Sequence, residues 1–248
     1  MKVIAIYSNK GGVGKTATAV NLSYRIACLG KRTLLCDLDS QGAASFYFRV
    51  RPMKKFNRKK LIKGKISKYI RGTDYENLDL LPSHLSFRNL DLALDRSSVG
   101  DKSMVMKNVF DTLADDYDVL VLDCPPNLTL LSENIFRVAD IIVTPVIPTI
   151  LSILALKQLI KMFPKLGLAK KKIAPFFSMV EKRKKLHCDV MRDYRKYRLF
   201  LQTAIPFVTH IERMGVTRCP VAVSHPHSEI ELLYSKLQWD VWKRSRHI

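Results

Sequence analysis

Short apolar runs alternate with longer amphipathic segments along the whole chain. Runs of roughly four to eight residues, mostly apolar and bounded by Gly, Pro or Asp, predict buried strands at 3–7, 32–37, 78–82, 118–123, 141–145, 173–180 and 203–206. Apolar residues spaced by three and four predict helices at 17–29, 87–94, 102–114, 150–163 and 228–246. This alternation predicts an α/β fold, with a mainly parallel twisted sheet and helices on both faces.

The first predicted strand is followed by the stretch 8–16, Ser-Asn-Lys-Gly-Gly-Val-Gly-Lys-Thr. A glycine-rich turn between a strand and a helix directs backbone N–H groups into one concavity, which can bind phosphates. Lys15 would reach the β- and γ-phosphates of a nucleotide, and the Thr16 hydroxyl would hold Mg²⁺. The strict motif has glycine where this chain has Asn9, and the chain adds a second lysine, Lys10. A plain glycine turn with surface lysines is the alternative, which the position at a strand-to-helix junction disfavours.

Three aspartates end predicted strands or follow them closely. Asp37 and Asp39 are two residues apart, so they point the same way if strand geometry persists beyond Asp37. Such a pair suits Mg²⁺-bound water and an attacking water, and the alternative is an aspartate that caps a helix. Asp123 closes a wholly apolar strand and is the expected second Mg²⁺ carboxylate. We expect all three near the glycine-rich loop, at the carboxyl ends of parallel strands.

Length and composition indicate one globular domain spanning residues 1–248. No apolar run approaches the roughly 18 residues of a membrane span, and the chain begins with a strand pattern, without a signal peptide. Five cysteines are scattered without a Cys-x-x-Cys pair, which favours reduced thiols in the cytoplasm over a disulfide framework.

The formal net charge of +20 indicates a polyanionic partner, either nucleic acid or an anionic membrane surface. Between residues 49 and 71 the chain holds eleven Lys or Arg residues and no acid, with apolar residues interleaved. We interpret 49–71 as a basic surface insert, part helical and docked by its apolar residues. A solvated face without a partner is the alternative. A second basic segment spans 182–198.

Three motifs together resemble the deviant Walker A ATPases of the ParA/MinD family, and in particular the Soj-like ParA branch. They are Lys-Gly-Gly-Val-Gly-Lys-Thr at 10–16, Asp-Leu-Asp-Ser-Gln-Gly at 37–42 and Asp-Cys-Pro-Pro at 123–126. The likeness continues through 81–83, 146–156, 205–206 and 219–220, and covers most of the chain apart from the insert. It implies a P-loop NTPase fold of the SIMIBI type, with ATP and Mg²⁺ as cofactors.

The resemblance also implies roles for individual residues. Nucleotide contacts are expected from Lys10, Gly11, Gly12, Val13, Gly14, Lys15, Thr16 and Ala17. Asp39 is expected to orient the attacking water beside the catalytic Lys10 and Lys15, and Thr16, Asp37 and Asp123 are expected to manage Mg²⁺. In this family an ATP-bound homodimer forms in which the Lys10 equivalent reaches the partner's nucleotide. Ala17 replaces a usual threonine, which removes one hydroxyl contact to the α-phosphate.

The expected function is that of a ParA-type ATPase, a cytoplasmic, nucleoid-associated protein that positions or partitions a cargo such as a plasmid, a chromosome or a carboxysome. Its ATP-bound dimer is expected to bind nonspecific double-stranded DNA, and a ParB-like adaptor to stimulate slow hydrolysis. The candidate DNA-binding residues are Lys54, Lys55, Lys59, Lys60, Lys182, Arg183, Lys184, Arg195 and Arg213. Arg213 stands where many relatives carry a glutamate.

Three other functions stay open. A MinD-like membrane switch needs an amphipathic tail that can leave the domain, whereas the apolar stripe of 230–241 is expected to pack in the core, although this end could also touch a membrane. A metabolic or metal-cluster relative is the second, and the cluster carriers use paired cysteines that this chain lacks. The third is a nucleotide-binding module without turnover.

Overall fold

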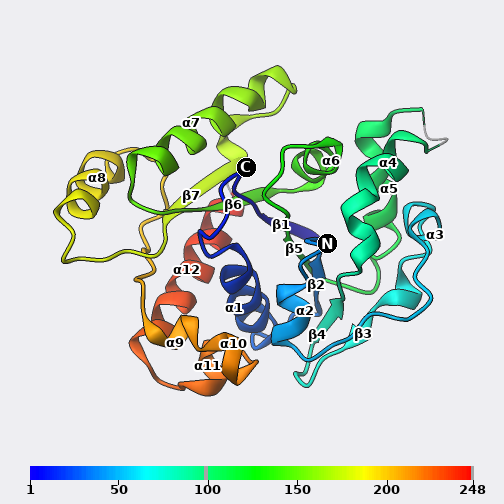
Figure 1. Cartoon of the computed structure of the whole chain (residues 1–248), viewed down its shortest axis with the longest axis horizontal. Helices are drawn as coiled ribbons and strands as arrows, with labels where there is room; N and C mark the ends of the chain where they lie inside the picture. Colours follow the sequence, from blue (N-terminus) through cyan, green and yellow to red (C-terminus); the bar gives the residue numbers. More distant parts are fainter. Residues whose placement is uncertain (98–99, 247–248) are drawn as a thin grey trace.

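The apolar runs form one seven-stranded sheet in the computed structural model, which describes residues 1–97 and 100–246. The strands lie in the order β3-β4-β2-β5-β1-β6-β7 (Figure 1). Their bounds are β1 Lys2–Ile6, β2 Thr33–Asp37, β3 Arg71–Gly72, β4 Leu78–Leu81, β5 Val119–Asp123, β6 Ile141–Val146 and β7 Ile173–Phe177. All neighbouring pairs are parallel except β3 with β4. The predicted mainly parallel α/β sheet is therefore confirmed.

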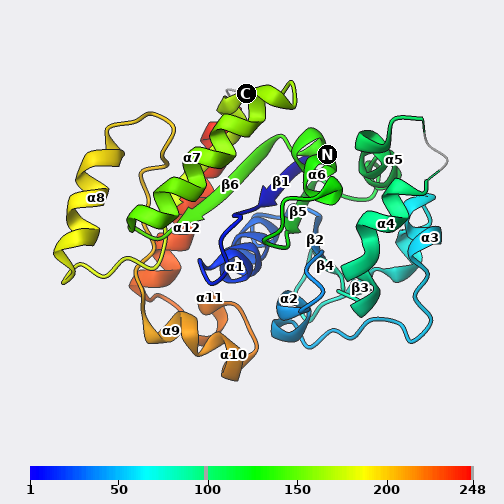
Figure 2. The ribbon, with the colours of Figure 1, turned by 45° about the horizontal axis from the view of Figure 1, so that its top comes forward.

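Helices cover both faces of this sheet, as predicted (Figures 1 and 2). The α-helices are α1 Lys15–Ala27, α2 Ala43–Tyr47, α3 Arg58–Ile62, α4 Leu90–Asp95, α5 Val105–Asp111, α6 Leu130–Val138, α7 Ile150–Lys165, α8 Lys185–Arg195, α9 Thr209–Glu212, α10 Met214–Thr217, α11 Val221–Ser224 and α12 Glu229–Ser245. Short 3₁₀ helices are η1 Ser67–Tyr69, η2 Leu85–Asn89, η3 Lys102–Met104 and η4 Lys170–Lys172.

Every strand except β3 supplies two hydrophobic cores, because alternate side chains point to opposite faces. In β1, Val3 and Ala5 pack with α4, α5, α6 and α7, whereas Ile4 and Ile6 pack with α1, α2 and α12. No helix within the described residues is long and apolar enough to cross a membrane. The stripe of α12 is buried in the second core through Ile230, Tyr234, Leu237 and Val241, as its spacing predicted.

The predicted strand at 203–206 is wrong. Only an isolated bridge between Val180 and Pro206 forms there. The Thr203 N–H donates to Asp240 Oδ2 on α12 at 2.9 Å, and a proline has no N–H to donate to a ladder. The segment still lies along β7, because the Ile205 N–H donates to the Phe177 carbonyl at 2.8 Å.

The insert 49–71 is part helical and docked by its apolar residues, as predicted. Leu61 and Ile66 are buried in the same core as α4 and α5. The Phe56 ring contacts the rings of Tyr69 and His84, with centroids 4.5 and 4.9 Å away. Aromatic packing of this kind fixes the insert as a defined surface and not as a loose tail.

Candidate nucleotide site

The glycine-rich loop joins β1 to α1 in the geometry that a phosphate cradle requires. Gly12 and Gly14 have φ of 68° and 89°, in the left-handed region that favours glycine. A Cβ on Gly14 would lie 3.0 Å from Ser178 Oγ, so the backbone approach is also tight. No side chain caps the start of α1 and its first turn holds no acid, which leaves its N–H groups for an anion.

Two lysines accompany this loop. Lys15 is buried, and its Nζ donates to the Lys10 carbonyl at 3.3 Å. Burial lowers the pKa of Lys15, although the carboxylates of Asp123 and Asp39 oppose that change. Lys15 forms no ion pair within residues 1–97 and 100–246, and a buried ammonium of this kind gains from a bound anion such as phosphate.

Lys10 extends in another direction, toward the start of α7. Its Nζ donates to Ser152 Oγ at 3.0 Å, and Thr149 Oγ1 donates to the same oxygen at 3.0 Å. Sequence reasoning missed Ser152, because no local pattern links residues 142 positions apart. The structure therefore holds the predicted catalytic Lys10 beside the exposed first turn of α7.

Asp37 and Asp123 end the adjacent strands β2 and β5 and are paired in register. Both carboxylates are buried, and burial raises the pKa of Asp37 to about 6 and that of Asp123 well above its usual value. The charge of Asp37 also raises the pKa of Asp123, and the charge of Asp39 raises the pKa of Asp37. Asp37 Oδ1 and both Asp123 oxygens lack a hydrogen-bond partner among the residues described. Buried, mutually repelling oxygens fit a hard divalent cation, and the nearby Thr16 hydroxyl adds another oxygen.

Asp39 lies in a turn, not in a continued strand, because β2 ends at Asp37. Its Oδ1 accepts the Gln41 N–H at 3.0 Å, so it caps the turn before α2 while its charge also acts on Lys15. Ser45 at the start of α2 donates its N–H and hydroxyl to Asp37 Oδ2 at 2.7 and 2.6 Å. Sequence reasoning missed Ser45, which belongs to no motif.

The candidate DNA-binding residues lie in three places. Lys54, Lys55, Lys59 and Lys60 are exposed on the insert. Lys182, Arg183 and Lys184 precede α8 and Arg195 ends it, on the opposite side of the molecule from α3 (Figures 1 and 2). Arg213 lies between α9 and α10. The structure therefore does not join these residues into one face of the chain.

Comparison with known proteins agrees with this geometry. The AAA_31 family model, described as an AAA domain, matches residues 1–174. The chain is 28% identical to the sporulation initiation inhibitor protein Soj of Bacillus subtilis (strain 168), over 97% of this chain and 98% of that protein. Its fold matches a plasmid partition protein of Borrelia burgdorferi B31 bound to AMPPNP, with TM-score 0.83 and 23% identity over 98% of this chain and 99% of that chain.

A second solved structure with this fold is the septum site-determining protein MinD of Pyrococcus horikoshii OT3 complexed with Mg-ADP. Its TM-score is 0.76 at 23% identity, covering 97% of this chain and 95% of that chain. The resemblance that the three sequence motifs carried is therefore confirmed. The chain belongs to the AAA_31 family and, within it, to the Soj/ParA type of ATPase.

Proposed function

We propose that the chain binds and hydrolyses ATP with Mg²⁺ and uses this cycle to switch its binding to DNA. The buried carboxylates of Asp37 and Asp123, beside the phosphate cradle, carry the proposal, because Asp37 Oδ1 and both Asp123 oxygens lack a hydrogen-bond partner within the described residues. Structures with the same fold hold AMPPNP or Mg-ADP, which supports an adenine nucleotide here.

Each group of residues in the site is assigned its own role in phosphoryl transfer. Backbone N–H groups of 11–17 bind the phosphates, and Lys15 balances charge on the β- and γ-phosphates. Mg²⁺, when bound by Thr16, Asp37 and Asp123, supplies positive charge beside the phosphates. Asp39 orients the attacking water through its free carboxylate oxygen. Turnover is expected to be slow until an adaptor protein completes or rearranges the site.

The first turn of α7 supports an ATP-dependent homodimer. Ile150, Leu151 and Leu154 are 63%, 68% and 50% exposed, which forms an apolar patch on the helix that holds Lys10 through Ser152. Apolar surface of this kind marks an interaction site. In such a dimer Lys10 leaves Ser152 and reaches the partner's phosphates, where a second cation stabilises the transferring group.

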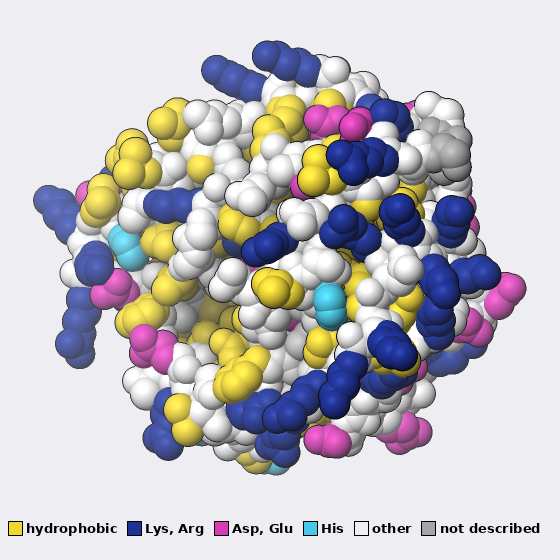
Figure 3. Space-filling view, turned by 45° about the vertical axis from the view of Figure 1, so that its right-hand side comes forward, with side chains coloured by type: hydrophobic (Ala, Val, Ile, Leu, Met, Phe, Trp, Pro, Cys, Tyr) yellow, Lys and Arg dark blue, Asp and Glu magenta, His cyan; other side chains and the backbone are white. Residues whose placement is uncertain are grey.

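The basic insert supports nonspecific binding of double-stranded DNA. Its lysines are exposed, and Figure 3 shows Lys and Arg side chains spread across this side of the molecule, with acids mainly at its margins. Phosphate contacts of this type are blind to sequence and sensitive to salt. With a ParB-like adaptor, the proposed role is to position or partition a cargo on the nucleoid, as the Borrelia relative is named for plasmids.

The test is retention of the full chain on nonspecific duplex DNA with ATP, with ADP and without nucleotide, across a salt series. Retention that needs ATP and falls steeply with salt is expected. Equal retention in all three nucleotide states would make the insert a constitutive anchor and contradict the switch. Binding to anionic liposomes instead of DNA would favour the membrane alternative, against which the burial of the α12 stripe speaks.

A further inference from the structure

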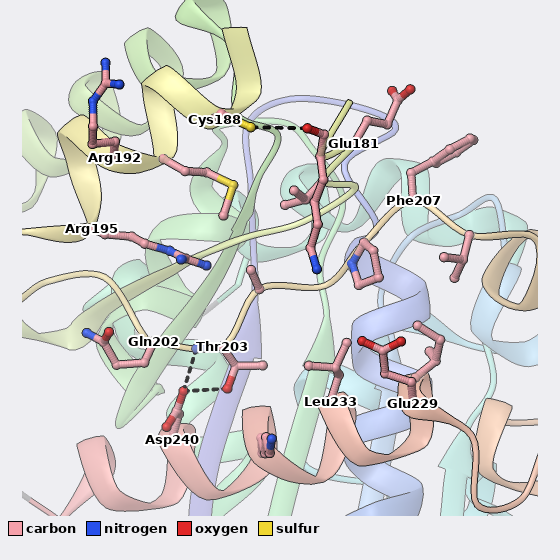
Figure 4. A pocket seen from close by; sticks show the side chains of 18 of the residues that line it. Glu181, Cys188, Arg192, Arg195, Gln202, Thr203, Phe207, Glu229, Leu233 and Asp240 are labelled. Atoms are coloured by element: carbon pink, nitrogen blue, oxygen red, sulfur yellow. Dashed lines mark hydrogen bonds between the residues drawn. The ribbon is translucent and has the colours of Figure 1, made fainter. Parts of the chain in front are cut away.

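A groove lies between α8, the segment 203–208 and α12 (Figure 4). In Figure 1, α8 and α12 lie away from α3 of the insert. Its volume of about 1120 Å³ exceeds the roughly 300–1,000 Å³ of small-molecule pockets. Met191 from α8 and Leu233 and Trp239 from α12 give it an apolar lining. Trp239 is 61% exposed, and an apolar surface of this size beside a groove marks an interaction site.

Four cations border the groove and form no ion pair within the described ranges 1–97 and 100–246. They are Lys182, Arg183, Arg195 and Lys236. The Arg195 side chain points from α8 into the cavity in Figure 4. Unpaired cations from both walls therefore face the same space, because Lys236 comes from α12.

The acids that line the groove have internal roles. Asp240 accepts the N–H and the hydroxyl of Thr203 at 2.9 and 2.8 Å. Glu181 pairs with Lys184 at 2.6 Å, and Glu229 lies in the first turn of α12, where the helix dipole favours an acid. The charge left for a partner on this surface is therefore positive.

The shape of the groove favours an acidic protein helix over a DNA duplex as the negatively charged partner. A DNA duplex is a stiff convex rod that cannot bring its phosphates to a concave apolar floor. An amphipathic helix places apolar side chains in a groove and keeps its charged side chains at the rim. An acidic helix would thus match both the floor and the four cations.

We propose that the groove between α8 and α12 binds an acidic amphipathic helix of a partner protein. Its apolar side chains pack on Met191, Leu233 and Trp239, and its carboxylates face Arg195 and Lys236. The identity of this partner as the adaptor rests on the proposed function, whereas the binding chemistry stands on the groove alone.

The test uses the nucleotide-free full chain and synthetic helical peptides of about 14 residues, roughly four turns. One peptide has leucines on one face and glutamates elsewhere, and its match has lysines in place of the glutamates. Calorimetry measures binding, and the emission of Trp239 reports its place. The acidic peptide is expected to bind and to shift this emission, a shift that W239F removes. The lysine peptide is expected not to bind.

The second part of the test reverses single charges at the rim of the groove. Arg195→Glu and Lys236→Glu are each expected to weaken binding of the acidic peptide at least about tenfold. Lys170→Glu makes the same change at an exposed residue outside the groove and is expected to change affinity by less than about twofold. All three positions are exposed, so circular dichroism should show the same fold.

Three results would overturn the inference. They are absence of acidic-peptide binding, equal binding of both peptides, and full displacement of the peptide by duplex DNA through the same residues. DNA and ATP assays are separate from this titration. A chain that binds the peptide but shows no ATP-gated retention on DNA contradicts the proposed function alone, and the reverse result contradicts the groove alone.

Discussion

The insert and the rim of the groove carry similar charge over different surfaces. In the insert, the apolar side chains of Leu61 and Ile66 are buried in the core, while the lysines of the segment are exposed. At the rim, Arg195 and Lys236 border a cavity whose apolar lining is open, with Trp239 largely exposed. Charge attracts a polyanion in both places, but the surface beneath the charge decides which polyanion can fit.

A substitution in the nucleotide site is expected to affect the insert and the groove most differently. Lys15→Ala is expected to weaken ATP binding by at least about a hundredfold, because a buried cation opposite the phosphates is lost. DNA retention should then no longer respond to ATP, while peptide binding at the groove stays unchanged. Titration with a fluorescent ATP analogue measures the first effect, with Lys107→Ala as a surface control. Normal ATP affinity in K15A would show that the phosphate site is misassigned.

The second largest difference is expected in how salt changes DNA retention by the insert and peptide binding by the groove. Retention on DNA is expected to fall by orders of magnitude between ~50 and ~200 mM salt if about six or more phosphates are contacted. Peptide affinity should fall by less than about tenfold over the same range, because apolar burial is not screened. Parallel titrations at four salt concentrations measure both slopes. Equal slopes would mean that the groove, too, binds by charge alone.

Matched charge reversals test the regions directly. Lys59→Glu with Lys60→Glu on the insert is expected to lower DNA affinity at least about tenfold, since each position loses a phosphate contact. Lys182→Glu with Arg183→Glu makes the same change of net charge at the groove and is expected to lower DNA affinity less than about threefold. Electrophoretic mobility shifts with ATP measure both variants. A larger loss from the groove pair would reverse the assignment.

The smallest effects are expected from substituting one aromatic residue in each region, Phe56 in the insert and Trp239 in the groove. Phe56→Ala removes the ring between Tyr69 and His84, so the free energy of unfolding should fall by about 1–3 kcal/mol and DNA affinity by only about threefold. Trp239→Ala removes an exposed ring, and stability should change by less than about 0.5 kcal/mol. Thermal melts of both variants measure the contrast. A large destabilisation by W239A would indicate that Trp239 belongs to the core.

Local patterns predicted much of this molecule. An apolar strand followed by glycines placed the phosphate loop, and Asp37 and Asp123 came into register because each ends a strand of one parallel sheet. What failed depends on distant partners. Ser152 on α7 holds Lys10 of the glycine-rich loop. Asp240 accepts the Thr203 N–H, which is why 203–206 is not a strand. Sequence also gave no way to see that the two basic segments lie on opposite sides.

The segment beside β7 has a consequence for solubility. N–H groups of Leu201 and Ile205 donate to carbonyls of Pro175 and Phe177 at 2.8 Å, so part of the outer edge of the sheet is already paired. An open edge strand invites pairing with another molecule and leads to aggregation. Asp240→Ala frees the Thr203 end of this cover, and light scattering should rise at a lower temperature than in the unchanged chain, with no such change in Lys236→Ala. Because this edge of β7 is covered, copies of the chain at high concentration are not expected to join along it.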